Sequence, residues 1–289
     1  MFAIIGPTAS GKSDLALELA QLLNYEIFSI DSLSIYKEID IASAKPSKEE
    51  LKLVKHYGIN EIYPNEHFNV AKLIEIFKSI KHKKLIIVGG SSFYLKTLID
   101  GISPMPYISE NIKKEAKKYS FEYLKKIDNL YASKINPYDS YRIQKGIEIY
   151  LATKTPPSIY FQKNPKIPII KDLPIFEIDI DRDSLRKRIK KRTHNMIKNG
   201  LIDEVSYLEK KYKDRRLQSL KAIGIKEVLD YFNGKYNLQT LEEKISTNTA
   251  KLAKRQQIFN KTQFQNKISL KKEELKHKIL KGINSDFNR

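Results

Sequence analysis

The sequence predicts an α/β fold, a parallel sheet flanked by helices, with a helical insertion domain. Two observations support this fold class. Short and continuously apolar runs alternate with segments of helical periodicity, and a glycine-rich turn lies between the first apolar run and the first helical segment. Strands that are apolar on both faces are typical of parallel sheets covered by helices on both sides.

The predicted elements follow from this alternation. Strands are expected at residues 2–5, 26–30, 83–90 and 175–180, with helices at 12–23, 70–80 and 93–99 between them. After the strand at 175–180 we expect helices only, the first capped by Asp183 or Ser184. The Lys-rich C-terminal end is expected to fray.

The chain is predicted to form a P-loop catalytic core of residues 1–106 and 136–289, with a helical insertion at residues 107–135. The insertion is rich in Lys, Glu and Tyr and has no strand pattern. Residues 154–174 hold most of the later prolines and are interpreted as a long connection.

Composition restricts the class of protein. The 289 residues include no Cys, which excludes disulfides and Cys-based metal sites and fits a reducing cytoplasm. The N-terminus lacks the pattern of a signal peptide, and no apolar run has the length of a membrane span, so a cytoplasmic protein without a membrane partner is expected. The net charge of +19 indicates either a polyanionic partner such as RNA or a solvated Lys-rich surface.

Residues 6–13 read GPTASGKS and match the phosphate-binding pattern G-x-x-x-x-G-K-[ST]. The backbone N–H groups of such a loop and the following helix N-terminus form an anion site. Lys12 would add a full positive charge, and the Ser13 hydroxyl can ligate Mg²⁺. The predicted phosphate-binding residues are Gly6, Pro7, Thr8, Ala9, Ser10, Gly11, Lys12 and Ser13. The fold class is thus P-loop nucleoside-triphosphate-hydrolase-like. The loop alone leaves open whether the site is nucleotide-binding, for example ATP-binding, or holds another diphosphate.

A second candidate residue, Asp31, follows the strand at 26–30. The apolar strand within 83–90 ends in glycines and serines rather than in the acidic residue that usually orients Mg²⁺ in P-loop NTPases. Asp31 would lie at the carboxyl edge of the sheet, where α/β proteins bind ligands. Its position fits a catalytic base and a helix cap equally well.

Six motifs occur in a characteristic order along the chain. They are GPTASGKS, DSLSIYKEIDIASAKPS, VGGSSFYLKTLIDGISPMP, YRIQKGIEIY, KAIGIKE and AKRQQIF. Together they resemble the tRNA dimethylallyltransferase family, also called tRNA isopentenyltransferases or IPP transferases. The resemblance extends from residue 6 to about residue 260.

The resemblance implies a prenyltransferase. The family transfers a dimethylallyl group from dimethylallyl diphosphate to the exocyclic amine of the adenosine 3′-adjacent to the anticodon. The tRNAs concerned read codons beginning with U, and the product is isopentenyladenosine. The implied cofactor is Mg²⁺, the implied partners are the tRNA anticodon stem-loop and dimethylallyl diphosphate, and a monomer is expected. The phosphate loop would then hold an isoprenoid diphosphate.

The resemblance also assigns roles to individual residues. Asp31 matches the general base, Ser91 a substrate-contacting hydroxyl, and Arg142 a basic residue near the diphosphate, although a surface ion pair would also explain Arg142. The implied tRNA-binding residues are Asp31, Ser32, Leu33, Ser34, Ser91, Lys113, Tyr141, Arg142, Ile143, Gln144, Lys145, Lys221, Lys254 and Arg255. The segments 186–192, 219–227 and 251–256 are expected to face the tRNA, and the insertion to contact the anticodon arm.

Some positions depart from the family pattern. Ser43 and Ser91 replace Thr, Ile225 replaces Tyr, and Lys145 replaces Arg. The QQIF stretch at residues 256–259 is expected to change packing only. None of these departures removes the phosphate loop or Asp31.

Three alternatives remain open from the residues alone. An adenylate isopentenyltransferase would use the same chemistry on a free nucleotide. A P-loop small-molecule kinase would use residues 186–193 as a lid. A non-enzymatic RNA-binding protein would keep the basic charge but not need an intact Lys12, Ser13 and Asp31.

Overall fold

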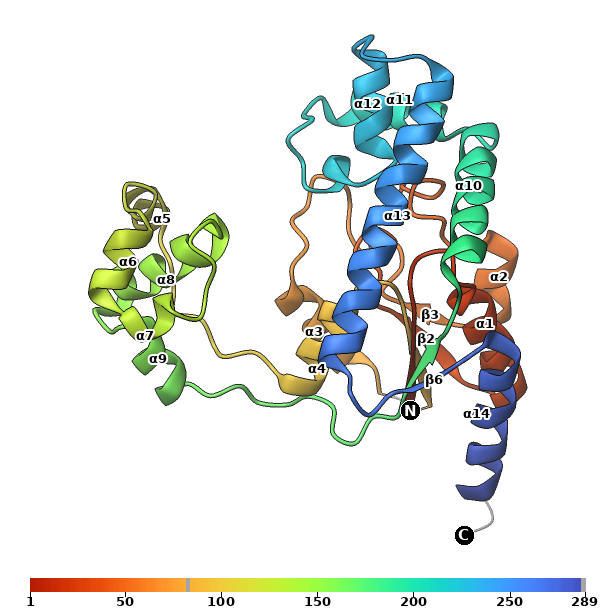
Figure 1. The fold of residues 1–289 in the computed structure, drawn as a ribbon, viewed down its shortest axis with the longest axis horizontal. Helices are drawn as coiled ribbons and strands as arrows, with labels where there is room; N and C mark the ends of the chain where they lie inside the picture. Colours follow the sequence, from red (N-terminus) through yellow and green to blue (C-terminus); the bar gives the residue numbers. More distant parts are fainter. Residues whose placement is uncertain (82–83, 287–289) are drawn as a thin grey trace. The chain divides into compact units, whose positions relative to one another are not determined.

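The computed structural model describes residues 1–81 and 84–286, with side chains up to residue 283. The chain divides into two compact units (Figure 1). Unit 1 comprises Met1–Lys96 and Asp172–Arg289, and unit 2 comprises Thr97–Lys171. Unit 2 interrupts unit 1 in the sequence and is longer than the insertion expected at residues 107–135, which it exceeds on both sides.

In the described residues, unit 1 is built on a six-stranded parallel sheet in the order β3-β2-β4-β1-β5-β6. The strands are β1 (Phe2–Ile5), β2 (Glu26–Ser29), β3 (His56–Tyr57), β4 (Leu85–Val88), β5 (Ile175–Ile178) and β6 (Ile268–Leu270). The predicted parallel α/β fold is confirmed. The two edge strands, β3 and β6, were not predicted because two or three residues are too few to show a period.

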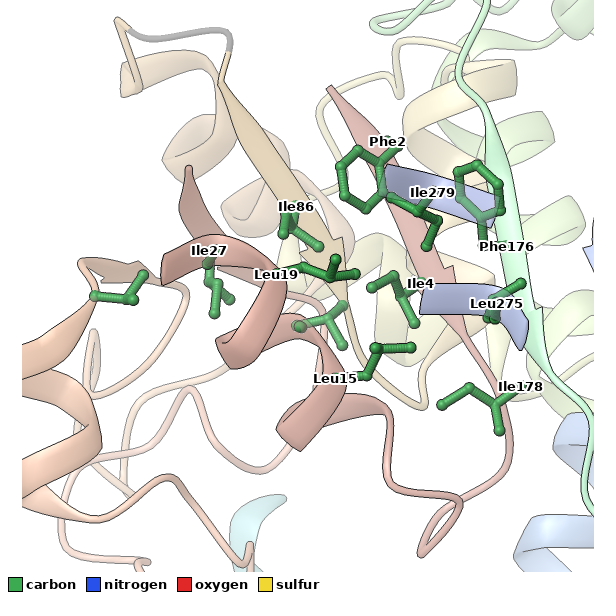
Figure 2. Close-up of a cluster of buried hydrophobic side chains, with 14 residues drawn as sticks. Phe2, Ile4, Leu15, Leu19, Ile27, Ile86, Phe176, Ile178, Leu275 and Ile279 are labelled. Carbon is green, nitrogen blue, oxygen red and sulfur yellow. The ribbon is translucent and has the colours of Figure 1, made fainter. Parts of the chain in front are cut away.

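The two faces of the sheet bury alternate side chains of each strand. Phe2 and Ile4 of β1 lie in one core cluster with side chains of α1 (Lys12–Leu23), as Figure 2 shows. Phe28 of β2 packs against Phe77 of α3 (Val70–Ser79) with ring centroids 5.2 Å apart. Both faces are therefore covered by helices, which explains why β1 and β4 are buried at every position.

Up to Asp286, the last described residue, the Lys-rich C-terminal segment is helical rather than frayed, so for this part the prediction was wrong; residues 287–289 lie outside the described residues. Helix α14 (Lys272–Asp286) packs on the same core as α1 through Leu275 and Ile279 (Figure 2). These two side chains are four residues apart and therefore share one helical face. The apolar residues of this segment are few among many lysines, so its amphipathic pattern is weak in the sequence. The helix is stabilised because these residues pack against the core of unit 1.

Unit 1 contains further helices between its strands and in its C-terminal region. They are α2 (Lys48–Leu53), α4 (Ser92–Asp100, which continues into unit 2), α10 (Arg182–Lys198), α11 (Leu201–Tyr212), the 3₁₀ turn η1 (Ser219–Lys221), α12 (Ile225–Phe232) and α13 (Leu238–Gln263). Helix α10 is capped by Asp181, which accepts hydrogen bonds from the N–H groups of Asp183 and Ser184. Asp183 and Ser184, which the sequence suggested as caps, therefore lie in the first turn of the helix, and Asp181 is the cap.

Unit 2 is helical in all of its described regular structure. Its helices are α5 (Glu110–Ala116), α6 (Phe121–Ile127), α7 (Asn129–Ala132), α8 (Ser140–Thr153) and α9 (Pro157–Lys163). Ile143 and Ile147 of α8 share a core with Leu124 of α6. Helix α8 therefore belongs to this unit, whereas the sequence assigned residues from 136 onward to the core. Helix α9 begins at Pro157, a residue well suited to the first helical position.

Of the helices in the described parts of the chain, none combines the length and the apolar character of a bilayer-spanning segment. The longest of them, α13, has 26 residues but is interrupted throughout by charged and polar side chains.

Candidate active site

The phosphate-binding loop joins β1 to the N-terminus of α1. Gly11 is the N-cap of α1 at φ 91°, and Ala9 adopts φ 65° although it has a Cβ atom. A left-handed conformation costs a residue other than glycine about 1 kcal/mol. Such strain is typical of loops whose shape serves binding, because their N–H groups must converge on one anion.

Lys12 lies almost fully buried under this loop, with 8% of its side chain exposed. Its Nζ donates a hydrogen bond to the carbonyl of Pro7 at 3.3 Å. Burial lowers the pKa of Lys12 to about 8; the neighbouring Arg192 also lowers it, while the carboxylates of Asp31 and Asp14 raise it. A bound polyanion would raise the lowered pKa again and stabilise the charged form of Lys12, so the site favours an anionic ligand.

Two arginines of α10, which lie 178 and 184 residues from their partners in the sequence, contact the loop. Arg188 Nη1 donates to the carbonyl of Ser10 at 2.9 Å, and Arg192 Nη1 donates to Thr8 Oγ1 at 3.3 Å. Burial lowers the pKa of Arg192, and Asp31 opposes this shift. We expected segment 186–192 to face tRNA, but these two side chains lie at the phosphate loop because they are four residues apart and share the face that α10 turns toward it.

Asp31 lies two residues after Ser29, the last residue of β2, and is partly exposed. Its Oδ1 accepts hydrogen bonds from the N–H groups of Leu33 at 2.8 Å and Ser34 at 3.2 Å. Asp31 therefore caps a turn at residues 32–35 rather than a helix, because no helix of the structure begins there. Among the described residues, Oδ2 has no hydrogen-bond partner, which leaves one oriented oxygen available for a proton.

The turn after β4 lies directly beside the Asp31 segment. A Cβ atom on Gly89 would come within 2.7 Å of Ile30 Cγ1 and 3.0 Å of the Asp31 backbone nitrogen. Only glycine permits this close approach. The fold thus brings the segment of Ser91, which is partly exposed, next to Asp31, as the sequence predicted for the carboxyl edge of the sheet.

Gln256 of α13 connects the phosphate loop to this turn. Its Oε1 accepts the Thr8 N–H at 2.8 Å, and its Nε2 donates to the Gly90 carbonyl at 2.8 Å. The sequence predicted only a packing change in residues 256–259. No local pattern could have shown this role, since Gln256 lies 248 residues from Thr8.

The segment that follows Asp31 is anchored to α11. Glu204 accepts hydrogen bonds from the N–H groups of Asp40 (2.7 Å), Ile41 (2.7 Å) and Ala42 (2.9 Å). Lys45 donates to the Tyr36 carbonyl at 2.5 Å and forms an ion pair with Asp40 at 2.8 Å. These contacts fix the segment whose first residue is the candidate base.

The other predicted tRNA-binding residues of unit 1 differ in exposure. Ser32, Lys221, Lys254 and Arg255 are exposed, Leu33 is partly buried and Ser34 is buried. The exposed basic residues lie on η1 and on α13, so their charges are available to a ligand in solvent.

Several predicted residues of unit 2 have partners within the unit. Arg142 forms an ion pair with Asp139 at 3.3 Å, and Lys113 forms one with Glu110 at 2.5 Å. Tyr141 is 70% exposed. The surface ion pair that the sequence left open for Arg142 is therefore present, although its guanidinium stays exposed enough to accept a phosphate as well.

Three neighbouring residues on α8, Ile143, Gln144 and Lys145, make contacts inside unit 2. Gln144 donates to Glu148 Oε1 at 3.0 Å, and Lys145 pairs with Glu148 Oε2 at 2.6 Å. Glu148 itself is buried, so these contacts compensate its charge. Ile143 is 8% exposed and packs in the core of the unit, which gives its side chain a structural role.

In unit 1 the arrangement defines a class of enzyme. A strained phosphate loop holds a buried lysine, arginines contact the loop, and an oriented carboxylate follows β2, which β4 separates from β1 in the sheet. Such a site can neutralise a diphosphate leaving group while a carboxylate accepts a proton from the attacking group. This is a P-loop fold equipped for group transfer.

Comparison with known proteins gives the family. The family model described as IPP transferase matches residues 34–263. A protein of Nautilia profundicola named tRNA dimethylallyltransferase is 69% identical over 283 residues, which covers 98% of this chain and 100% of that protein. The chain belongs to the IPP transferase family and is a prenyltransferase.

Solved structures agree with this assignment. The full-length tRNA isopentenylpyrophosphate transferase of Bacillus halodurans is 28% identical with a TM-score of 0.70, covering 98% of this chain and 95% of its own. A eukaryotic dimethylallyltransferase described as acting on tRNA has a TM-score of 0.80 at 25% identity, covering 94% of this chain and 73% of its own. The predicted family and fold class are thus confirmed.

Proposed function

We propose that this chain transfers a dimethylallyl group from dimethylallyl diphosphate to the exocyclic amine of the adenosine 3′-adjacent to the anticodon. The tRNAs would be those that read codons beginning with U. The observation that supports this most directly is the presence, at one sheet edge, of a phosphate loop and of Asp31, whose Oδ2 has no hydrogen-bond partner in the described part of the chain. The relatives named tRNA dimethylallyltransferase support the choice of substrates.

On the donor side, the diphosphate leaves as the allylic carbon–oxygen bond breaks. The loop N–H groups, Lys12 and Arg192 would bind its oxygens and stabilise the charge that develops on them. Ser13 directly follows Lys12, and its side chain is exposed, so its hydroxyl fits a Mg²⁺ ligand. When bound, Mg²⁺ would supply further charge neutralisation on the diphosphate.

On the acceptor side, the adenine amine attacks the allylic carbon and loses a proton. Asp31 Oδ2 would accept this proton as the new carbon–nitrogen bond forms, and diphosphate departs with the bonding electron pair. The backbone hydrogen bonds to Oδ1 orient the carboxylate for this transfer. Ser91, on the adjacent turn, would contact the substrate through its hydroxyl.

The tRNA would bind through phosphate contacts and through the flipped base. Extruding a base from its stack costs a few kcal/mol, which backbone contacts offset. We propose that the exposed Lys221, Lys254 and Arg255 of unit 1, together with Arg142 and Tyr141 of unit 2, contact the anticodon stem-loop. We propose that the protein acts in the cytoplasm, because a chain without Cys suits reducing conditions. We also propose that it acts as a monomer.

A prenyl-transfer assay tests the proposal. The purified protein is mixed with Mg²⁺, labelled dimethylallyl diphosphate, and either unmodified tRNA with adenosine 3′ of the anticodon or free AMP. We expect label in the tRNA and none in AMP. Label in AMP alone would assign the chain to nucleotide prenylation, and label in neither would contradict the proposal.

A further inference from the structure

Gln256 links two loops that serve different halves of the reaction. It accepts a hydrogen bond from the phosphate loop at Thr8 and donates one to the Gly90 carbonyl, both at 2.8 Å. Gly90 directly precedes Ser91, and its neighbour Gly89 touches the Asp31 segment. One amide side chain thus spans the donor loop and the turn beside the candidate base.

The glycine at position 90 allows the amide of Gln256 to lie close to the backbone. A Cβ atom on Gly90 would lie 2.5 Å from Gln256 Nε2. The absence of a side chain at residue 90 is therefore what lets the amide approach the backbone. Gln256 itself extends from α13, a 26-residue helix that packs against α10, so its Cα position is held by long-range packing.

The two bonds also define which loop amides remain for the ligand. The Thr8 N–H is occupied by Gln256, so the anion is left to the amides that follow it in the loop. Thr8 Oγ1 accepts a bond from Arg192 at 3.3 Å. Thr8 is therefore a fixed point of the loop, held on its backbone by α13 and on its side chain by α10.

We propose that Gln256 is a positioning residue that sets the spacing between the diphosphate loop and the Gly90–Ser91 turn. This inference rests on the proposed prenyl transfer for its kinetic consequence. Reaction by displacement requires the acceptor to be aligned on the donor carbon, and an error of about 1 Å can cost on the order of 100-fold in rate. Gln256 touches no reacting atom and acts through the two backbones.

Two substitutions separate the halves of this link. Gln256→Met keeps the length and volume of the side chain but removes both hydrogen bonds. Gln256→Glu keeps an acceptor for the Thr8 N–H but cannot donate to the Gly90 carbonyl. The matched control is Gln257→Met, because Gln257 is a partly buried neighbour on the same helix whose side chain makes no hydrogen bond to the described residues.

Kinetics form the first readout. We expect Gln256→Met and Gln256→Glu to lower kcat about 10- to 100-fold, with the KM for dimethylallyl diphosphate changed less than about threefold. Gln257→Met should keep wild-type kcat. A wild-type kcat in either Gln256 variant, or an equal loss in Gln257→Met, would overturn the inference.

Hydrogen exchange forms a second readout that does not need turnover. We expect added pyrophosphate to slow exchange in the peptide containing residues 89–92 of the wild type and of Gln257→Met, but not of Gln256→Met. Exchange of the Thr8 amide should be faster in Gln256→Met and unchanged in Gln256→Glu. If Gln256→Met still transmits the effect of pyrophosphate to residues 89–92, the link is not through this side chain.

The two readouts also distinguish this inference from the proposed function. A wild-type protein that transfers no label would contradict the proposed function. The exchange experiment would still decide whether Gln256 couples the loops, since pyrophosphate alone is the probe. Thermal unfolding of each variant shows whether a loss of kcat reflects global destabilisation instead.

Discussion

At the scale of single residues, Asp31 combines two tasks on its two carboxylate oxygens. Oδ1 accepts the N–H groups of Leu33 and Ser34, whereas Oδ2 is free of hydrogen bonds to the described residues. The sequence left base and cap as alternatives, but the structure makes them compatible. The capping bonds orient the oxygen that would accept the proton.

Asp31→Asn separates these tasks. The amide oxygen of Asn can still accept the capping bonds, but the group is not a base. We expect turnover to fall about 10²- to 10⁴-fold with an unchanged unfolding midpoint. Asp31→Ala should abolish transfer, lower stability by about 1 kcal/mol through loss of the cap, and leave tRNA affinity within a few-fold. Near-normal turnover of Asp31→Asn in the prenyl-transfer assay would show that the base is another group.

Lys12 predicts a pH dependence of anion binding. Because burial lowers its pKa to about 8, Lys12 loses its proton as the pH rises through that value in the free enzyme. We expect the affinity for pyrophosphate to fall up to about tenfold per pH unit above it. Calorimetric titrations with pyrophosphate from about pH 6.5 to about pH 9.5 bracket the pKa of Lys12. At each pH, the affinity of the wild type is divided by that of Lys12→Met. This ratio removes the effect of the titration of pyrophosphate itself. A ratio that does not change with pH would contradict the assignment of Lys12 to the anion.

At the scale of elements, the position of the Asp31 segment depends on α11. Glu204 accepts three consecutive N–H groups from residues 40–42. Lys211 of the same helix donates to Glu38 at 2.5 Å, and Tyr212 donates to Glu38 at 2.8 Å. The irregular segment between β2 and α2 is thus held by a helix far along the chain.

Glu204→Ala tests this anchor. Three N–H groups lose their acceptor, and we expect the free energy of unfolding to fall by about 1–3 kcal/mol, with lower turnover because the Asp31 segment loosens. Urea unfolding monitored by circular dichroism measures the change. Asp203→Ala, an exposed neighbour on the same helix, should change stability by less than about 0.5 kcal/mol. An equal loss in both variants would show that the anchor has no specific role.

The elements also show how far local pattern could predict the fold. Strands β1 and β4 were expected because each is an apolar run, FAII and LIIV, and β2 and β5 because apolar residues dominate EIFS with the following Ile30 and IFEI. Strand β6 and helix α14 were not, because their apolar residues gain meaning only against β5 and α1. Helix α9 was hidden in a proline-rich stretch, where proline at the first helical position starts a helix instead of ending one.

At the scale of the whole molecule, the net charge of +19 predicts how tRNA binding responds to salt. The six basic residues predicted to contact tRNA are Lys113, Arg142, Lys145, Lys221, Lys254 and Arg255. If each neutralises one phosphate, the logarithm of the affinity should fall with the logarithm of salt concentration with a slope of about −4. Lys145 already forms an ion pair with the buried Glu148, so we expect it to contribute less to the slope than the other five residues.

Filter binding of an anticodon stem-loop over a salt series measures this slope. Lys254→Ala should make it shallower by about 0.7, because one phosphate contact is lost. Lys52→Ala, which removes an exposed charge on α2 outside every segment expected to face the tRNA, serves as the control for net charge alone. A flat slope for the wild type would show that the basic excess is a solvated surface.

The sequence by itself determined the phosphate loop, the strand that precedes it and the carboxylate after the second strand. These features are encoded within a few neighbouring residues, where backbone geometry and side-chain type act locally. The order of six motifs was likewise enough to indicate the family.

Only the tertiary structure decided which distant side chains complete the site. Arg188 and Arg192 were expected at the tRNA but contact the phosphate loop, and Gln256 bridges that loop to Gly90. These partners are more than 160 residues apart in the chain. Their meeting depends on how α10 and α13 pack on each other and over the sheet edge, and no local pattern of residues contains that information.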